Sequence, residues 1–351
     1  MTGDSLLWQT QGAHADPQPW RVAVVMPCYR VRDQILDVIA RIGPECAAIY
    51  VVDDGCPERS GTLVEEQCAD PRVRVIFHAS NRGVGAAVIT GYRAALAERA
   101  NVIVKIDGDG QMDPADMPRL IAPIVQGEAD YAKGNRFYSL AHIHRMPRAR
   151  IAGNAGLSFV TKFSTGYWDI FDPTNGYTAI HGAVAELLPL DRVAERYFFE
   201  SDMLYHLGLV GGVVRDVPID ARYGDERSSM RLQRVIVPFA LKHAANTVRR
   251  LFYQYFLRDF SAASVELVLG VALLTFGTIY GAVQWIAWQG RGVGAYSGTV
   301  MLAALPVIVG AQLLLAFLSF DVARVPRKPL YPQLLRWRGA ERLLQRAHRS
   351  A

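Results

Sequence analysis

Two aspartates, Asp107 and Asp109, stand one residue apart directly after the apolar run 102–106. Where a buried strand gives way to a loop, two carboxylates at this spacing can hold one hard divalent cation against a phosphate. Mg²⁺ and Mn²⁺ take few protein carboxylates and complete their coordination with water and phosphate oxygens. The alternative is a solvated turn, because Asp and Gly are common in turns. An EF-hand is excluded, since the twelfth loop position counted from Asp107 is Pro118 rather than Glu.

The elements that would position these carboxylates alternate along the amino-terminal half. Apolar, largely β-branched runs predict strands at residues 21–26, 48–52, 73–77 and 102–106. The segments between them that are compatible with helices are residues 34–42, 62–68 and 86–100. This alternation predicts an α/β fold with a doubly wound, mostly parallel sheet, which binds ligands beyond the carboxyl ends of its strands. Five residues are expected at that edge: Pro27, Asp53, Asp54, Asn81 and Asp107.

A glycine-rich segment, residues 83–91, opens the third predicted helix. Gly-x-Gly at a helix start lets the backbone approach a ligand closely, and a helix N-terminus favours an anion. The alternative is tight packing of the helix on the sheet. The segment does not match the dinucleotide fingerprint Gly-x-Gly-x-x-Gly, because its sixth position is Val88, and this argues against an NAD enzyme.

Taken in order, four motifs resemble those of the family-2 inverting glycosyltransferases, whose nucleotide-sugar-binding domain has the GT-A fold. They lie at residues 25–29, 51–55, 81–87 and 107–111, and the resemblance covers roughly residues 21–223. It implies a set of contacts to a nucleotide-diphospho-sugar donor from Pro27, Tyr29, Asp53, Asp54, Asn81, Gly83, Asp107 and Gly108. It also implies Mg²⁺ or Mn²⁺ at Asp107, Asp109 and Gln111, with Asp109 acting in catalysis.

Departures from the family pattern concern the donor. Many relatives have Asn-Glu where this chain has Arg30-Val31, and Lys where it has Val84. The sugar and the nucleotide base are therefore not assigned.

Three further segments resemble a narrower group, the polyprenyl-phosphate glycosyltransferases of the dolichyl-phosphate mannose synthase type. They are residues 132–137, 172–177 and 221–229. The resemblance implies that Arg136, Arg222 and Ser228 bind the acceptor phosphate, and that Arg136 takes part in the transfer. Arginine suits this role because its planar fork binds phosphate through two parallel hydrogen bonds. The alternative for each arginine is an ordinary surface ion pair.

An acidic pair, Glu200 and Asp202, falls where other family-2 enzymes place a catalytic acid at a helix start. Asp202 is the predicted catalytic residue, and Glu200 stays open as the alternative. A sugar hydroxyl acceptor would need a general base there, whereas a phosphate acceptor is already ionised. Asp202 could then orient the acceptor or cap the helix.

The carboxyl-terminal third has a different character. Residues 267–288 and 299–320 carry no charge. At 1.5 Å per residue each is about 33 Å long, enough to cross a hydrocarbon core of roughly 30 Å. The alternative is a buried hairpin of a soluble protein. Basic residues flank the pair on both outer sides, so the positive-inside rule predicts a multi-pass inner (plasma) membrane protein with its catalytic domain in the cytoplasm.

Residues 235–260 combine large apolar side chains with Lys and Arg before the first span. They resemble amphipathic helices lying in the lipid interface, broken near Pro238. The alternative is a helix that packs back on the catalytic domain. The predicted domains are a polar extension (1–20), a GT-A catalytic domain (21–232), interfacial helices (233–262), two transmembrane helices (263–322) and a basic tail (323–351).

Composition narrows the partners. The net charge of +5 could suggest nucleic acid, but the basic residues concentrate after Arg222 beside apolar segments, which favours an anionic bilayer. The four cysteines show no Cys-x-x-Cys spacing and are interpreted as reduced thiols. No nucleic-acid partner is expected, and a homo-oligomer is left open.

These observations predict an enzyme that transfers one sugar to a polyprenyl phosphate with inversion. Two alternatives remain. One is a processive polysaccharide synthase of the same superfamily, since residues 333–337 satisfy its Gln-x-x-Arg-Trp pattern. The other is a membrane scaffold without activity that keeps the same sheet, although the intact Asp107 and Asp109 argue against it.

Overall fold

The computed structural model describes residues 20–138, 148–219, 232–290, 294–338 and 340. The chain divides into two compact units, which are described separately. The sheet unit contains the described residues up to His243 together with those from Pro326 onward. The hairpin unit is Ala244–Val325.

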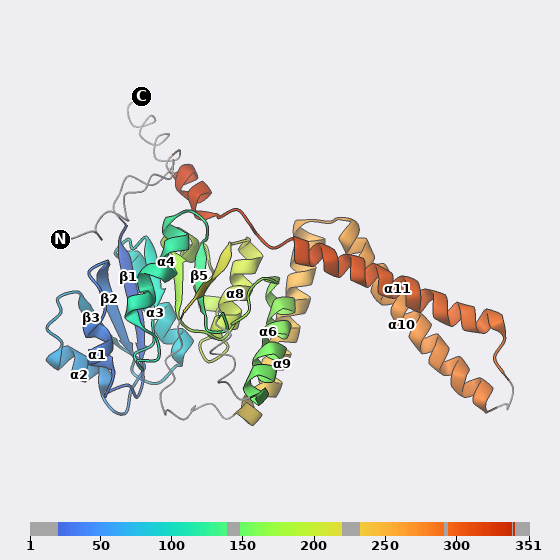
Figure 1. Ribbon diagram of the computed structural model, residues 1–351, viewed down its shortest axis with the longest axis horizontal. Coiled ribbons are helices and arrows are strands. Elements are labelled where there is room, and N and C mark those ends of the chain that lie inside the picture. The colour runs from blue at the N-terminus through green and yellow to red at the C-terminus, as the bar shows by residue number, and fades with distance from the viewer. Residues whose placement is uncertain (1–19, 139–147, 220–231, 291–293, 339, 341–351) are drawn as a thin grey trace. The chain divides into compact units, whose positions relative to one another are not determined.

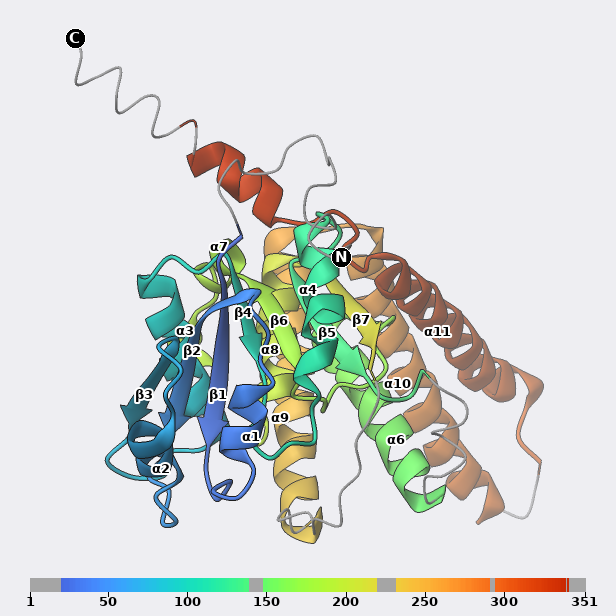
Figure 2. The same ribbon diagram turned by 60° about the vertical axis from the view of Figure 1, so that its left-hand side comes forward.

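A seven-stranded sheet forms the centre of the sheet unit (Figure 1). Its strands follow the order β3-β2-β1-β4-β6-β5-β7 (Figure 2). Its strands are β1 (Val22–Cys28), β2 (Cys46–Asp53), β3 (Val73–Phe77), β4 (Val102–Lys105), β5 (Tyr131–Asn135), β6 (Thr178–His181) and β7 (Val214–Pro218). Only β6 runs antiparallel, to both β4 and β5. The predicted α/β fold with a mostly parallel sheet is confirmed, and each of the four predicted strands is present.

Helices cover both faces of this sheet (Figure 2). One hydrophobic core lies under α1 (Ile35–Ala40), α2 (Ser60–Gln67) and α4 (Met117–Val125). It takes alternate residues of β1, namely Val22, Val24 and Met26, as the two-residue repeat of a strand requires. On the opposite face α3 (Val84–Ala97) packs so closely that a Cβ at Gly91 would collide with Val25.

The sheet unit has three further short elements, η2 (Pro114–Asp116), α7 (Gly182–Ala185) and η3 (Leu190–Arg192). It also has the longer helices α6 (Arg148–Thr165) and α8 (Phe199–Val210) and the first part of α9 (Leu232–Phe252). Helix α8 packs against α3 and α6, so it lies on the same sheet face as α3.

Helix α9 continues through Pro238, so the predicted break at that proline is wrong. Proline removes one backbone hydrogen bond but leaves the chain helical where packing holds both sides. Phe239 and His243 both contact the ring of Phe198, with ring centroids 5.3 and 4.8 Å apart. The first half of α9 therefore packs on the sheet unit, as the alternative interpretation of this segment proposed.

The hairpin unit consists of the end of α9, the π-helix η4 (Tyr253–Arg258), α10 (Ala262–Gln289) and α11 (Ser297–Ala323). Helices α10 and α11 are long and apolar enough to cross a membrane, and only 22% and 11% of their most apolar windows are buried. Gly270 and Gly310 let the two backbones approach, because a Cβ at Gly310 would lie 2.6 Å from the backbone nitrogen of Leu274. The exposure argues against the buried hairpin of a soluble protein.

A buried ion pair fixes the register within the hairpin unit. The guanidinium of Arg250 donates two hydrogen bonds to Asp321, at 2.7 and 3.0 Å. The hydroxyl of Tyr255 donates a third to the same carboxylate at 2.6 Å. The ion pair joins the end of α9 to the end of α11. A charged contact therefore lies at this end of the apolar helix pair.

After α11 the chain returns to the sheet unit. The buried carboxylate of Asp130 accepts hydrogen bonds from the backbone N–H groups of Leu330 and Tyr331, at 2.8 and 2.9 Å, and from that of Val213 at 2.8 Å. The ring of Tyr331 stacks on His181, with centroids 4.0 Å apart. This contact lies where β5 begins and β6 ends, which is the edge opposite to the carboxyl end of β4.

Candidate active site

The paired aspartates occupy the loop that follows β4, at the carboxyl edge of the sheet. A carboxylate oxygen of Asp109 accepts a hydrogen bond from the backbone N–H of Gln111 at 3.0 Å, and Gly110 adopts the left-handed conformation with φ of 76°. The loop is thus a tight turn that carries Asp107, Asp109 and Gln111 close in sequence. Two carboxylates and one amide oxygen are hard donors, which suit Mg²⁺ or Mn²⁺ better than zinc. No cluster of three or more His, Cys, Asp or Glu side chains that could hold a metal by itself occurs among the described residues.

A lysine at the end of β4 reaches the same loop. The ammonium of Lys105 lies 2.8 Å from one carboxylate oxygen of Asp107 and 3.4 Å from one of Glu200. Its side chain is only 1% exposed. Burial by itself would lower the pKa of Lys105, but the neighbouring charges of Asp107 and Glu200 outweigh it and raise the pKa above that of free lysine. Lys105 therefore stays charged and joins α8 to the aspartate loop.

The two acidic residues at the start of α8 have different partners, and Glu200 is the one that contacts Lys105. The carboxylate of Asp202 accepts a hydrogen bond from the backbone N–H of Ala194 at 2.8 Å, and so holds the loop before the helix. Glu200 instead faces Asp107 through Lys105, with 14% of its side chain exposed. A catalytic role for Asp202 remains a prediction, while the geometry brings Glu200 to the aspartate loop.

Charged and polar side chains form a row across four neighbouring strands. Lys105 of β4 pairs with Thr178 of β6, Thr178 pairs with Lys133 of β5, and Lys133 pairs with Asp216 of β7. Directly paired residues point to the same face of a sheet. The row thus begins at Lys105, which contacts Glu200 of α8, and ends at the edge strand β7.

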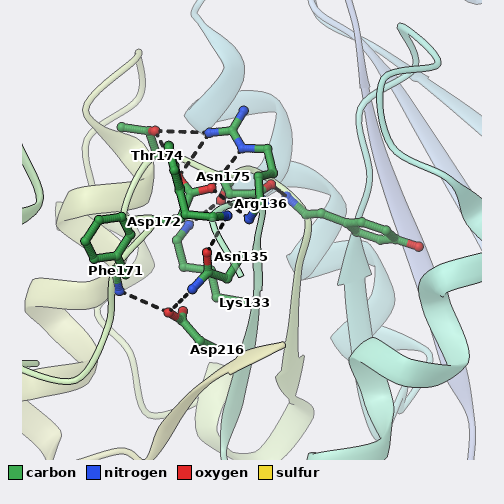
Figure 3. A network of polar contacts seen from close by, with 10 residues as sticks. Lys133, Asn135, Arg136, Phe171, Asp172, Thr174, Asn175 and Asp216 are labelled. Carbon is green, nitrogen blue, oxygen red and sulfur yellow. Dashed lines mark hydrogen bonds and ion pairs between the residues drawn. The ribbon is translucent and has the colours of Figure 1, made fainter. Parts of the chain in front are cut away.

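Arg136 follows β5 and is held by a buried aspartate (Figure 3). Its Nε and one Nη donate to the two carboxylate oxygens of Asp172, at 2.8 and 3.0 Å. The side chain of Asp172 is 1% exposed and that of Arg136 is 24% exposed. A two-bond contact to a buried partner fixes the plane of the guanidinium while part of the arginine remains open to solvent. Arg136 is therefore not an ordinary surface ion pair.

The segment that carries Asp172 is itself anchored to the polar row (Figure 3). The ammonium of Lys133 donates to the backbone carbonyl of Asn175, and Asp216 accepts from the backbone N–H of Phe171 at 3.0 Å. Asp216 also accepts from the side-chain amide of Asn135 at 2.8 Å. Residues 171–175 are thus bound at both ends, which positions the partner of Arg136.

Burial shifts the pKa of two members of this row. It lowers the pKa of Lys133 to about 8, although the nearby charges of Asp172, Glu200 and Asp216 act in the opposite direction. It raises the pKa of Asp216 to about 6, against the hydrogen bond from Phe171 and the charge of Lys133. Both groups therefore titrate closer to neutrality than they would in water.

Asp53 and Asp54, predicted donor ligands, hold the loops at the ends of β2 and β3. The carboxylate of Asp53 accepts from the backbone N–H groups of Cys56 and Gly61, both at 2.7 Å. That of Asp54 accepts from the N–H of Gly83 at 2.7 Å and lies 2.8 Å from Nδ1 of His78. Both aspartates are buried, so in this structure they shape the loops.

The glycines at the start of α3 serve packing. Gly83 has a φ of 112°, and a Cβ there would lie 2.5 Å from the carbonyl oxygen of Glu195. A Cβ at Gly85 would meet the carbonyl of Ala194 and, at 2.9 Å, the ring of Phe199. Gly83 and Gly85 thus pack against the segment before α8, while Gly91 packs on the sheet, and the predicted contact of this segment with a ligand stays a prediction.

The other predicted donor contacts lie along the same edge. Pro27 is the last residue but one of β1, and Tyr29, the first residue after this strand, is 41% exposed. Asn81 is exposed in the loop before α3. Gly108 sits between the two aspartates, where a Cβ would touch Val31 and Ile35 at 3.3 and 3.4 Å. Arg222 and Ser228 lie outside the described residues, so their predicted contact with the acceptor phosphate stays a prediction.

Comparison with known proteins identifies the family. The model for glycosyl transferase family 2 matches residues 23–188. The polyprenol monophosphomannose synthase of Mycolicibacterium smegmatis is 32% identical over 218 residues, which cover 60% of this chain and 82% of that protein. The chain belongs to glycosyltransferase family 2.

Other relatives of this glycosyltransferase have similar names. The undecaprenyl-phosphate mannosyltransferase of Micrococcus luteus is 28% identical over 204 residues, 57% of this chain and 82% of that protein. Among solved structures, glucosyl-3-phosphoglycerate synthase from Mycobacterium tuberculosis with phosphoglyceric acid superposes with a TM-score of 0.50. It is 18% identical and covers 66% of this chain and 80% of that one. This likeness supports the fold, and the predicted GT-A fold is confirmed.

The sequence did not assign Lys105, Lys133, Asp172 or Asp216 in the glycosyltransferase site. A signal existed for the two lysines, since each interrupts a strand that is otherwise buried. Lysine is almost never fully buried unless it is paired, so each lysine could have indicated a carboxylate or carbonyl partner elsewhere in the chain. Asp172 gave no such signal, because an Asp-Pro pair reads first as the start of a turn.

Proposed function

We propose that this glycosyltransferase moves a single sugar from a nucleotide-diphospho-sugar to a polyprenyl phosphate at a membrane surface, with inversion at the anomeric carbon. The relatives named for polyprenol and undecaprenyl phosphate support this acceptor. A third relative, from Methanococcus voltae, is a UDP-N-acetylglucosamine–dolichyl-phosphate N-acetylglucosaminyltransferase, and it is 28% identical over 234 residues. Two of these relatives are named for mannose and the third for N-acetylglucosamine, while all three are named for a polyprenol or dolichol phosphate.

The observation that carries the proposal is the geometry of Arg136. Its guanidinium is held by buried Asp172 at the carboxyl edge of the sheet. Arg136 follows β5, and the aspartate loop follows β4, so one strand, β6, lies between them. A pre-oriented arginine that is partly open to solvent is suited to a phosphate, because little side-chain freedom is lost on binding. Arg136 would hold the acceptor phosphate while the donor diphosphate lies at Asp107 and Asp109.

A divalent cation held by Asp107, Asp109 and Gln111 would neutralise charge on the leaving nucleoside diphosphate. The chain's own residues supply the rest. Lys105 orients Asp107, and Arg136 fixes the acceptor phosphate, which is ionised at neutral pH and needs no general base. Holding both reactants in line supplies much of the acceleration, since it converts an encounter into a positioned reaction.

The two apolar helices and the basic residues around them support attachment to the inner membrane with the sheet unit in the cytoplasm. A lipid acceptor requires such attachment, whereas a soluble acceptor does not. Exposed apolar residues on α9, among them Ile236, Val237 and Leu241, would face the lipid interface beside the site.

The structure disfavours the processive synthase. Residues 333–337, which satisfy the Gln-x-x-Arg-Trp pattern, belong to the segment anchored by Asp130. Asp130 precedes β5, whereas Arg136 follows it. A strand of five residues separates these edges by about 16 Å. The tail motif therefore lies at the edge opposite to Asp107 and Arg136.

The test is a panel of nucleotide sugars offered to the purified, detergent-solubilised protein with undecaprenyl phosphate, followed by mass analysis of the lipid. We expect one hexose-sized addition and no further growth. A chelator should abolish the product and Mg²⁺ or Mn²⁺ should restore it, while Asp109→Asn should remain inactive with either ion. A multi-sugar product, or equal use of a free sugar alcohol, would overturn the acceptor assignment, and undiminished turnover in chelator would overturn the metal assignment.

A further inference from the structure

Lys105 lies where three separate parts of the sheet unit meet. It belongs to β4, its ammonium contacts Asp107 of the next loop, and it also reaches Glu200 at the start of α8. The two carboxylates come from distant parts of the chain, since Lys105 and Glu200 are 95 residues apart in the sequence. One buried cation thus links an aspartate expected to hold metal to an acidic residue of another element.

The fold leaves room for this ammonium. A Cβ at Gly176 would collide with Nζ of Lys105 and would lie 3.0 Å from a carboxylate oxygen of Asp107. Any larger residue would therefore push the lysine away from the loop. The segment that supplies Asp172 to Arg136 thereby also shapes the seat of Lys105.

Two carboxylates share one cation at this point. Asp107 and Glu200 each carry a negative charge, and Lys105 supplies one positive charge to both. A buried cation needs an ionised partner, since an unpaired one would cost several kcal/mol of desolvation. The three groups together keep one negative charge, which favours binding of a cation at the loop.

We propose that Lys105 is a positioning residue that holds Glu200 against the aspartate loop and offsets part of its negative charge. Glu200, rather than Asp202, is then the acidic side chain of α8 that acts at the transfer site. The proposal deepens the proposed function and rests on it for the identity of the reaction. Its electrostatic part depends only on how the loop binds a cation.

Opposite effects on cation binding follow from this arrangement. Lys105→Met keeps the length of the side chain and removes a positive charge beside Asp107, so Mn²⁺ should bind more tightly, on the order of three- to tenfold. Glu200→Gln keeps the shape and removes a negative charge, so Mn²⁺ should bind more weakly by a similar factor. In the double variant the two changes should largely cancel.

The experiment measures free Mn²⁺ by electron paramagnetic resonance during titration of the full-length protein, with UDP and with GDP. Transfer to undecaprenyl phosphate is measured on the same preparations. Lys105→Met and Glu200→Gln should each lower kcat at least thirtyfold, and the double variant should lose little more than either, as expected for residues that act as one unit. Lys105→Arg should recover part of the kcat, and the matched control Asp202→Asn should leave Mn²⁺ binding unchanged.

Several results would overturn the proposal. Weaker Mn²⁺ binding in Lys105→Met, unchanged binding in Glu200→Gln, or multiplicative losses of kcat in the double variant would each do so. If Lys105→Met fails to fold, Glu200→Gln alone decides, because its predicted loss of Mn²⁺ affinity does not require the lysine variant. A lack of lipid product in the parent protein would remove the proposed function and leave the Mn²⁺ titrations interpretable.

Discussion

Buried charges gather at one edge of this sheet, although burying a charge costs free energy unless it is paired. Lys105, Lys133 and Asp172 are each almost fully inaccessible, and Asp216 is partly so. Each has a partner among the described residues, and the partners come from different strands and loops. A cluster of this kind stabilises little, so its position beside Asp107 and Arg136 is best explained by function.

The contact between Arg136 and Asp172 leads to a first prediction. Arg136→Ala should raise the KM for the lipid phosphate about ten- to a hundredfold, because a hydrogen bond to a charged group contributes about 1.5–3 kcal/mol. Asp172→Asn should raise the same KM by a smaller factor, since the arginine stays but loses its fixed plane. Steady-state kinetics with varied lipid phosphate would measure both.

The control for these variants is Arg119→Ala. Arg119 also pairs with an aspartate, Asp116 at 3.3 Å, but its side chain is 58% exposed on the surface. It should leave the KM unchanged. Equal effects of Arg136→Ala on lipid phosphate and on nucleotide-sugar binding would contradict an acceptor role for Arg136.

Asp216 predicts a pH dependence of stability. Its pKa is raised to about 6 in the folded protein by burial, so between pH 4 and pH 6 the folded state binds more protons than the unfolded state. Its contribution to stability is therefore present at low pH and is lost as the pH rises through about 6. Asp216→Asn, which resembles the protonated form, should lack this loss.

The measurement compares thermal unfolding of the two full-length proteins at pH 4.5 and pH 7. The Tm of Asp216→Asn relative to that of the parent should be higher at pH 7 than at pH 4.5. A relative Tm that is independent of pH would show that this carboxyl is not perturbed in the folded protein.

At the scale of elements, hydrogen bonds from the backbone to single carboxylates hold several connections in place. Asp53 and Asp54 fix the loops after β2 and β3, and Asp202 fixes the loop before α8. Asp130 does the same for a segment two hundred residues away, since it accepts from the N–H of Leu330. Buried N–H groups need acceptors, so each of these carboxylates determines where a loop can lie.

The docking of the tail can be tested through Asp130. Asp130→Ala would leave the backbone N–H groups of Val213, Leu330 and Tyr331 buried without this acceptor. An unsatisfied buried donor costs about 1–3 kcal/mol, so we expect a loss of stability of at least that size and release of the tail. Limited proteolysis after residue 325 and thermal unfolding would report both effects.

Tyr331→Phe is the matched control for the tail. It removes only the hydrogen bond from the hydroxyl to the carbonyl of Ile124, at 2.7 Å, and keeps the ring that stacks on His181. Its tail should remain protected. Protease resistance of the tail in Asp130→Ala equal to that of the parent would argue that other contacts hold this segment.

At the scale of the whole molecule, the chain path constrains membrane topology. The sheet unit contains residues from before α10 and residues from after α11, because the segment from Pro326 onward belongs to it. Two crossings between these segments would return the chain to the side from which it started. The path agrees with the topology that the positive-inside rule predicts, in which both flanks lie in the cytoplasm.

A fourth prediction follows for sealed vesicles. Protease sites inserted beside Arg222 and beside Ala340 should both be cut in inverted inner-membrane vesicles, and both should be protected in right-side-out vesicles. A site inserted at Gly294, between the two helices, should show the reverse pattern. Opposite accessibility of the first two sites would refute a two-span hairpin.

The sequence by itself determined the layers of this protein. Alternating β-branched runs and helical segments predicted the mostly parallel sheet, and two long uncharged runs predicted α10 and α11. These patterns are local, because a strand or a helix repeats its burial within a few residues. The Asp107–Gln111 motif was also found locally, since its donors lie in one short loop.

Only the tertiary structure decided which distant side chains meet. It brought Glu200 rather than Asp202 to Asp107, placed Asp172 behind Arg136, and anchored residues 330–331 on Asp130. These pairs depend on the order and register of β4, β6, β5 and β7, which no local pattern encodes. Pairing in a sheet joins residues far apart in the chain, so the partner of a buried charge is known only once the strands are placed side by side.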